Sequence, residues 1–320
     1  MRWGVAGHGD VVARRVLPAL RRLGEDPVFL WGRDARRAER AARDWGVPAS
    51  GADPRGLTDG TDAVYVATPV VHHVPLAVRA LAAGLPVLVE KPLAGALGPA
   101  DAALHAAGAR TGVAYYRRLA PAVTRLRAEL AGWRPERVEV RFRCAFAPGP
   151  GHPMRWRTDP AVSGGGVLAD AGSHRLDLLL MLFGRPAEVR ARLGDRFPAG
   201  AERRAGLDLT WPGTRAHLCF EWSDAPPADR LAFHGAGRSV VLDPLDSGTL
   251  TVRGPGGVRR ETAGRPANPH VPLIADFAAA VAGGRPPVCT AADAALVDEV
   301  IAAAGRSTAR GGAPVSLRPS

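Results

Sequence analysis

The sequence predicts an α/β protein with two parts: a doubly wound parallel sheet at the N-terminus and, after it, an α+β domain with a mostly antiparallel sheet. In the first 117 residues, short apolar runs alternate with segments of helical spacing, the order typical of a parallel sheet. After residue 138, strands with an apolar residue at every second position are separated by Gly, Pro and Asp turns. A chain of 320 residues suits two domains, and we expect them to span residues 1–117 and 118–320.

The N-terminal part reads as strands and helices in strict alternation. Strands are expected at 3–6, 28–31, 63–67, 87–89 and 112–115, and helices at 11–23, 36–45, 74–83 and 99–108. The first helix carries Val12, Val16 and Leu20 on one face. Gly46 and Gly84 follow two others, at positions where a helix commonly ends. This order predicts a parallel sheet covered by helices on both faces.

The C-terminal part has the pattern of half-buried strands. Residues 138–144 read Val-Glu-Val-Arg-Phe-Arg-Cys, the alternation of a strand with one buried and one solvated face. Further strands are expected at 189–193, 207–211, 217–222, 231–234, 240–242 and 250–252, and helices at 172–183, 273–282 and 291–306. The short turns between the strands predict an antiparallel sheet.

Composition excludes several classes of protein. The formal net charge is +11, but the arginines are spread along the chain without a basic run, so we expect no nucleic-acid partner. No apolar stretch is long enough for a membrane span, and the N-terminus lacks a signal-peptide pattern. Cys144, Cys219 and Cys289 form no Cys-x-x-Cys pair, so we expect neither disulfides nor a metal site. A cytoplasmic protein fits these features best.

A glycine-rich turn joins the first strand to the first helix. It reads Gly-Val-Ala-Gly-His-Gly-Asp-Val-Val from Gly4 to Val12. Gly7 would permit the tight turn, and Gly9 would let the backbone approach a pyrophosphate at the helix N-terminus. The third small position of this dinucleotide-binding pattern is filled by Val12. The turn therefore predicts a dinucleotide site with an imperfect fingerprint.

The end of the second strand bears on which dinucleotide is bound. Gly32 stands where an acidic residue would bind the ribose 2′-hydroxyl of NAD, and Arg33 follows it. An arginine can pair with a 2′-phosphate, so NADP(H) is the preferred cofactor. NAD(H) is the alternative, in which Arg33 is a solvated side chain and Asp34 reaches the ribose.

Two further loops follow the third and fourth strands, at the edge where a doubly wound sheet binds ligand. One begins with Thr68 and Pro69. The other is Glu90-Lys91-Pro92 and contains the only lysine among 42 basic residues, a compact ammonium suited to proton or hydroxyl chemistry. The residues expected at the cofactor are Gly7, His8, Gly9, Asp10, Val11, Arg33, Thr68, Pro69, His73, Glu90 and Lys91.

A second glycine-rich segment runs from Gly164 to Asp177. Its first three residues are glycines, which allow a close backbone approach. Asp170, His174 and Asp177 follow at helical spacing, so on a helix they share a face. A carboxylate beside an imidazole suits a proton shuttle. The alternative is an acidic residue at a helix start and a surface histidine.

Together these motifs resemble the glucose-fructose oxidoreductase, inositol dehydrogenase and MocA-like superfamily over nearly the whole chain. The resemblance rests on residues 63–69, 90–92, 164–177, 276–277, 284–287 and 315–317. It implies a Rossmann fold followed by a domain with an open-faced, mostly antiparallel sheet. It also implies hydride transfer between NAD(P) and the carbinol or ketone carbon of a sugar, nucleotide-sugar or cyclitol-like substrate.

The resemblance also implies roles for particular residues. Lys91 would bind the reacting oxygen, Asp170 would bind substrate or orient the histidine, and His174 would be the general acid/base. The residues expected at the substrate are Lys91, Arg117, Trp156, Asp170 and His174. Other side chains that could read its hydroxyls are Arg157, His152 and His270. Homodimers or homotetramers would form through the open face of the C-terminal sheet.

Three positions depart from the family pattern: Val12, Val70 and Tyr116. They could alter the cofactor pose or the shape of the substrate site. Two other functions stay open beside the sugar dehydrogenase. One is a reductase of an imine or another non-sugar substrate on the same fold. The other is a catalytically silent NAD(P)-binding regulatory protein, which the presence of Lys91 and His174 disfavours.

Overall fold

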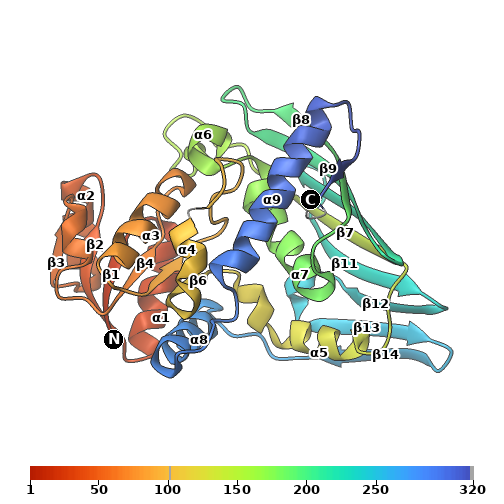
Figure 1. Cartoon of the computed structure of the whole chain (residues 1–320), viewed down its shortest axis with the longest axis horizontal. Coiled ribbons are helices and arrows are strands. Elements are labelled where there is room, and N and C mark those ends of the chain that lie inside the picture. The colour runs from red at the N-terminus through yellow and green to blue at the C-terminus, as the bar shows by residue number, and fades with distance from the viewer. Residues whose placement is uncertain (101, 318–320) are drawn as a thin grey trace. The chain divides into compact units, whose positions relative to one another are not determined.

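The computed structural model describes residues 1–100 and 102–317 (Figure 1). The chain forms two compact units. The first contains Met1–Ala94, Pro99–Tyr116 and Pro266–Ala295, and the second contains Gly95–Gly98, Arg117–Arg265 and the chain from Leu296 onward. No helix in the described part of the chain is long and apolar enough to cross a membrane.

The first unit is built on a six-stranded sheet in which every pair of neighbours is parallel. The order is β3-β2-β1-β4-β5-β6. The strands are β1 (Arg2–Ala6), β2 (Asp26–Trp31), β3 (Ala49–Gly51), β4 (Ala63–Val66), β5 (Val87–Val89) and β6 (Thr111–Val113). The predicted doubly wound parallel sheet is confirmed. Strand β3 was not predicted, because a three-residue Ala-Ser-Gly strand has no apolar run.

Helices of the first unit follow the predicted alternation. They are α1 (Leu17–Arg22), α2 (Ala35–Trp45), α3 (His73–Ala82), α4 (Ala102–Ala106) and α8 (His270–Gly283). A π-helical turn, Val12–Val16, precedes α1, so the helix expected at 11–23 is not α-helical throughout. The expected helix at 99–108 is shorter, and residue 101 lies outside the described residues.

Residues 266–295 belong to the first unit although they follow most of the second in the sequence. Phe277 of α8 packs against Trp3, with ring centroids 5.9 Å apart. A Cβ on Gly112 would lie 2.8 Å from the Phe277 ring. Val113 donates its backbone N–H to Cys289 at 3.0 Å. A segment from near the C-terminus therefore completes the core under the parallel sheet.

The second unit is built on a nine-stranded sheet with the order β14-β13-β12-β11-β7-β10-β9-β8-β15. The strands are β7 (Arg137–Cys144), β8 (Glu188–Arg196), β9 (Glu202–Trp211), β10 (Thr214–Trp222), β11 (Ala228–Gly235), β12 (Arg238–Leu242), β13 (Thr249–Gly254), β14 (Gly257–Thr262) and β15 (Val315–Ser316). All neighbours are antiparallel except β7 and β10. The predicted mostly antiparallel sheet is confirmed.

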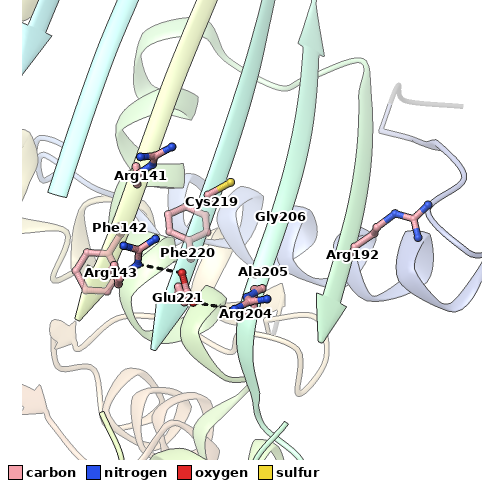
Figure 2. Close-up of a pocket in the computed structure, with 10 residues that line it drawn as sticks. All are labelled: Arg141, Phe142, Arg143, Arg192, Arg204, Ala205, Gly206, Cys219, Phe220 and Glu221. Carbon is pink, nitrogen blue, oxygen red and sulfur yellow. Dashed lines mark hydrogen bonds and ion pairs between the residues drawn. The ribbon is translucent and has the colours of Figure 1, made fainter. Parts of the chain in front are cut away.

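Helices pack on one face of this sheet. They include α5 (Pro121–Leu130), the short α6 (Pro160–Ser163), α7 (Ser173–Phe183) and α9 (Ala291–Ala309). The ring of Phe183 at the end of α7 contacts Trp211 and Phe233, with centroids 5.5 and 6.3 Å apart. Among the described residues of the second unit, no helix covers the opposite face (Figure 1). Exposed charged side chains such as Arg141 (Figure 2) and Arg215 line that open face.

Candidate active site

The glycine turn after β1 fits a dinucleotide. Gly7 has φ +110°, and a Cβ there would lie 2.4 Å from the carbonyl oxygen of Ala67. The Gly7 N–H donates to the carbonyl of Trp31 at 2.8 Å. A Cβ on Gly9 would meet no described atom within 4 Å. Glycine is therefore required by packing at position 7, while position 9 presents its backbone to open space, as pyrophosphate binding demands.

A histidine and an aspartate lie at the end of β2, on the side of the turn that would meet the adenosine ribose. A Cβ on Gly32 would lie 2.4 Å from the His8 ring, so the imidazole fills the place of a side chain there. Asp34 caps α2 by accepting the N–H of Arg37 at 3.1 Å. That hydrogen bond lowers the pKa of Asp34. Burial, together with the charge of Arg37, lowers the pKa of His8.

The loops after β4 and β5 are tied together by a buried histidine. His73 Nε2 lies 2.9 Å from the carbonyl oxygen of Thr68, and Nδ1 lies 2.9 Å from that of Pro92. The ring is 1% exposed, so His73 connects the two loops internally. The Thr68 hydroxyl is buried and has no hydrogen-bond partner among the described residues. A bound dinucleotide would satisfy that hydroxyl, which is a second point of fit.

Beside Lys91, a buried carboxylate is held by two side chains. Glu90 Oε1 accepts a hydrogen bond from the Tyr65 hydroxyl at 3.0 Å, and it lies 3.0 Å from His270 Nε2. Burial alone would raise the pKa of Glu90, but the His270 hydrogen bond and the charges of His270 and Lys91 lower it. The Tyr116 ring packs on His270 with centroids 5.5 Å apart. The peptide bond between Lys91 and Pro92 is cis.

In the second unit, the glycine run beginning at Gly164 meets β9. A Cβ on Gly166 would lie 2.0 Å from the carbonyl oxygen of Glu202. The Glu202 carboxylate accepts the N–H groups of Gly166 at 2.9 Å and Leu168 at 3.2 Å. Burial raises the pKa of this carboxyl. The close approach that the glycines predicted is therefore made to the protein's own backbone.

Asp170 lies in a π-helical turn, Leu168–Gly172, that leads directly into α7. Irregular turns of this kind are common at functional sites. Arg157 donates from Nη1 to Asp170 at 3.1 Å, and the guanidinium lies 5.5 Å from the ring centre of Trp156. His174 is in the first turn of α7 and is 6% exposed. The structure thus brings together three residues expected at the substrate: Trp156, Arg157 and Asp170.

Other charges of this region are occupied by ion pairs within the second unit. Asp177, expected on the same helix face as Asp170, pairs with Arg118 at 2.8 Å, and both are buried. Arg175 pairs with Asp229 at 2.6 Å. Arg117, expected at the substrate, is buried and pairs with Asp246 at 2.5 Å. These pairs fix the start of α7 and the segment after β6.

Comparison with known proteins agrees with this geometry. Residues 1–116 match the model described as "Oxidoreductase family, NAD-binding Rossmann fold", and residues 100–241 match the "GFO/IDH/MocA C-terminal domain". The chain belongs to the GFO/IDH/MocA oxidoreductase family. The family resemblance noted from the motifs is confirmed, as is the NAD-binding Rossmann domain.

Relatives within the GFO/IDH/MocA family include sugar oxidoreductases. The chain is 29% identical to 1,5-anhydro-D-fructose reductase of Ensifer adhaerens, over 91% of each chain. It is 33% identical to dTDP-3,4-didehydro-2,6-dideoxy-alpha-D-glucose 3-reductase of Streptomyces violaceoruber, over 76% of this chain and 72% of the relative. The crystal structure of an oxidoreductase domain protein from Kribbella flavida aligns with a TM-score of 0.87 at 26% identity, over 100% of both chains.

Sequence reasoning missed some residues that shape the site of this GFO/IDH/MocA family member. Glu202 lies two residues before the exposed Arg204 on β9, so alternation alone would place its side chain on the open face. The structure buries it instead. Asp246 lies in a loop 129 residues from Arg117, its partner. No local signal marks either pairing. For His270, named only as a possible substrate contact, the structure shows a bond to Glu90 across 180 residues.

Proposed function

We propose that this protein is an NAD(P)-dependent dehydrogenase or reductase. It transfers hydride between the nicotinamide and the carbinol or ketone carbon of a sugar, nucleotide-sugar or cyclitol-like substrate. The observation that carries the proposal is the position of Lys91, the only lysine, directly after β5 and beside the buried Glu90. The sugar substrates named for the relatives from Ensifer adhaerens and Streptomyces violaceoruber support the substrate class.

A bound nicotinamide supplies or takes up the hydride. The proposed work of the chain's own residues is to bind the oxygen and move its proton. The Lys91 ammonium binds the oxygen of the reacting carbon and stabilises negative charge as it develops there. His174 accepts the hydroxyl proton in the oxidative direction and donates it in the reductive direction.

Asp170 is proposed to bind a substrate hydroxyl or to orient His174. Its hydrogen bond with Arg157, at 3.1 Å, holds the carboxylate in position. Arg117 and Trp156 are proposed to contact the substrate as well. The ion pair of Arg117 with Asp246 fixes the direction of its guanidinium. Turns that would hold the dinucleotide comprise Gly7, His8, Gly9, Asp10, Val11, Thr68 and Pro69, with His73 and Glu90 behind them.

We propose NADP(H) as the preferred cofactor, with NAD(H) as the alternative. Arg33 is exposed next to Gly32, and its charge reaches far enough to help lower the pKa of His72, after burial. The Asp34 carboxylate is engaged in capping α2. A 2′-phosphate would therefore find the Arg33 cation at this edge.

A fluorescence titration with NADPH and NADH tests this preference. Arg33→Gln should weaken NADPH binding by about tenfold, the value of one charge-assisted hydrogen bond to a phosphate. NADH binding should change little. Arg43→Gln is a matched control, since Arg43 lies at the far end of α2 in a pair with Glu39. Tighter binding of NADH by the wild type would reject the NADP preference and favour Asp34 as the ribose ligand.

Turnover of a panel of sugars, nucleotide-sugars, cyclitols and imines tests the activity. Lys91→Met should lower turnover by on the order of 10³-fold, because the stabilising charge at the oxygen is lost. Dinucleotide binding should stay close to that of the wild type. Normal turnover by Lys91→Met would reject the mechanism. Imine reduction without sugar turnover would favour the imine reductase, and dinucleotide binding without any turnover would favour the silent regulatory protein.

We also propose that copies of the chain associate as a homodimer or homotetramer through the open face of the nine-stranded sheet, and that the protein is cytoplasmic. The uncovered face supports the first proposal. Light scattering on the purified protein measures the mass of the particle directly. A monomer at every concentration up to the micromolar range would reject association.

A further inference from the structure

Gly32, the residue directly after β2, lacks room for a side chain although its backbone does not require glycine. Its φ lies outside the left-handed region in which glycine is favoured. A Cβ at this position would nevertheless lie 2.4 Å from Cδ2 and 2.8 Å from Nε2 of His8. The next neighbour, Cβ of Ala38, would be at 3.3 Å, which a small shift relieves. The imidazole of His8 is therefore the group that excludes a side chain at position 32.

Hydrogen bonds of the backbone keep the His8 ring in this place. The N–H of Gly7 donates to the carbonyl of Trp31 at 2.8 Å and ties the turn after β1 to the end of β2. On the other side, the N–H of Gly32 donates to the carbonyl of Gly51 on β3 at 3.0 Å. A backbone shift at either glycine would break one of these bonds. Room for a side chain at position 32 is therefore made by rotating the His8 side chain.

Position 32 is where an NAD-binding fold usually places its acidic residue, because a carboxylate at the end of the second strand accepts from the ribose hydroxyls. In this chain a carboxylate there would displace the His8 ring from the space over Gly32. His8 is half-buried, so the displaced ring would move to its accessible side. A ligand would have to lie on that same side, and the ring would obstruct it.

The His8 ring acts by its shape. Burial is the main cause of a lowered pKa for His8, and the charges of Arg37 and Arg40 add to it, although the charge of Asp34 opposes them. Above the ordinary value of 6.5 the imidazole is therefore neutral. A neutral ring offers no charge to a 2′-phosphate. Its effect on the choice of dinucleotide comes from the space that it occupies.

We propose that His8 is a specificity-determining residue of the dinucleotide site, because it excludes an acidic side chain from position 32. The proposal rests on the NAD(P)-dependent function proposed for this chain. Arg33 supplies the charge that attracts a 2′-phosphate, while His8 prevents the end of β2 from supplying an acidic acceptor to the ribose of NAD(H). His8 and Gly32 act as a pair, so the site becomes selective for NAD(H) only when both are changed.

Fluorescence titrations with NADPH and NADH at pH 8 test this coupling in the full-length protein. Gly32→Asp alone should weaken both dinucleotides by at least about tenfold, NADPH through charge repulsion and NADH through the displaced ring. Adding His8→Ala lets the carboxylate take the place of the ring. NADH should then bind about tenfold more tightly than to Gly32→Asp, the value of one charge-assisted hydrogen bond, while NADPH stays weak. Equal NADH binding by Gly32→Asp and the double variant would overturn the proposal.

Gly32→Ala separates crowding from charge, because it adds the Cβ without a carboxylate. It should weaken both dinucleotides alike, and adding His8→Ala should restore binding to that of the His8→Ala protein. Gly51→Ala on β3 is the matched control, since a Cβ there would lie at an ordinary 3.6 Å from the Phe29 ring and should change neither affinity. Thermal unfolding of each variant checks that the fold is retained. Binding by Gly32→Ala equal to that of the wild type would overturn the exclusion by His8.

The same titrations distinguish this proposal from the preference for NADP(H). If the wild type bound NADH more tightly and the double variant still regained the NADH binding lost in Gly32→Asp, the role of His8 would be supported and the NADP(H) preference rejected. Preference for NADPH without coupling between positions 8 and 32 would overturn the role of His8 alone. No binding of either dinucleotide by any of these proteins would overturn both.

Discussion

Glu90 in the first unit and Glu202 in the second are both buried, and each lies just behind a segment that carries a proposed reaction residue. Glu90 adjoins Lys91, and Glu202 holds the turn that leads to Asp170. Their pKa values nevertheless shift in opposite directions, downward for Glu90 and upward for Glu202. Burial acts on both in the same sense, so their partners make the difference.

The partners of Glu90 are side chains, one of which can carry charge. His270 donates to it and, with Lys91, offsets its negative charge. The main partners of Glu202 are the uncharged backbone N–H groups of Gly166 and Leu168. The backbone donors hold the carboxyl in place and lower its pKa, but burial raises the pKa by more. The groups that bond to a buried glutamate thus decide whether its ionised form is favoured, as at Glu90, or disfavoured, as at Glu202.

The largest effect is expected from crowding the contact between Gly166 and Glu202. Gly166→Ala would place a Cβ 2.0 Å from the backbone oxygen of Glu202, so a strand or the turn must move. We expect a loss of about 3 kcal/mol in the free energy of unfolding, measured by guanidinium denaturation. Gly194→Ala on β8 is the control, because a Cβ there meets no described atom within 4 Å. A Gly166→Ala protein as stable as the control would contradict the tight approach.

Glu90→Gln removes the buried negative charge that lies between His270 and Tyr65. We expect a loss of about 2 kcal/mol at pH 7, because the hydrogen bonds with His270 and Tyr65 lose their charged acceptor. The pKa of Glu90 is lowered in the folded protein, so its contribution is complete above the ordinary value of 4.5 and declines as pH falls through the lowered value. Urea unfolding at several pH values should show the two proteins converging below pH 4.5. A difference that does not shrink in acid would contradict the lowered pKa.

Glu202→Gln should give the opposite pH dependence. At pH 7 we expect a loss of about 1 kcal/mol, because the amide can accept only one of the two N–H groups. The raised pKa of Glu202 means that its protonated form is favoured in the folded state. Relative to the variant, the wild type therefore becomes more stable as pH falls through the raised pKa toward 4.5. Parallel pH profiles for wild type and variant would refute the proposed contrast with Glu90.

Tyr65→Phe should have the smallest effect. Its hydroxyl is one of two side-chain donors to Glu90, and the ring keeps its packing in the variant. We expect a loss of about 0.5 kcal/mol in thermal or chemical unfolding at pH 7. His270 remains to hold the carboxylate, so the pH dependence attributed to Glu90 should persist. If Tyr65→Phe abolished that dependence, the assignment of the charge partner to His270 would be wrong.

Local patterns were sufficient for much of the fold. The apolar runs of β4 and β5 and the alternation of β7 are visible in short windows, so the sheet types could be predicted. The exposed β14 reads Gly-Val-Arg-Arg-Glu-Thr and has no apolar face to detect. The parallel pairing of β7 with β10 depends on contacts between distant segments, which periodicity does not encode.

In the candidate site, too, some features follow from local sequence and others depend on contacts between distant segments. The need for glycine at position 7 follows from its place between a strand and a helix, and the structure gives it a positive φ and a close neighbour. The glycine at position 166 was also expected to allow a close approach, but its partner Glu202 is 36 residues away. Residue types thus indicated where the backbone is crowded, while the neighbour responsible required the tertiary structure.

A ribosome synthesises a chain in the N- to C-terminal direction, so the six parallel strands emerge long before α8 does. Until Phe277 has been made, Trp3 lacks one of its aromatic packing partners and Glu90 lacks His270. Most of the second sheet must be synthesised while the nucleotide-binding unit is still incomplete. The core of the nucleotide-binding unit is therefore expected to be completed only late in translation.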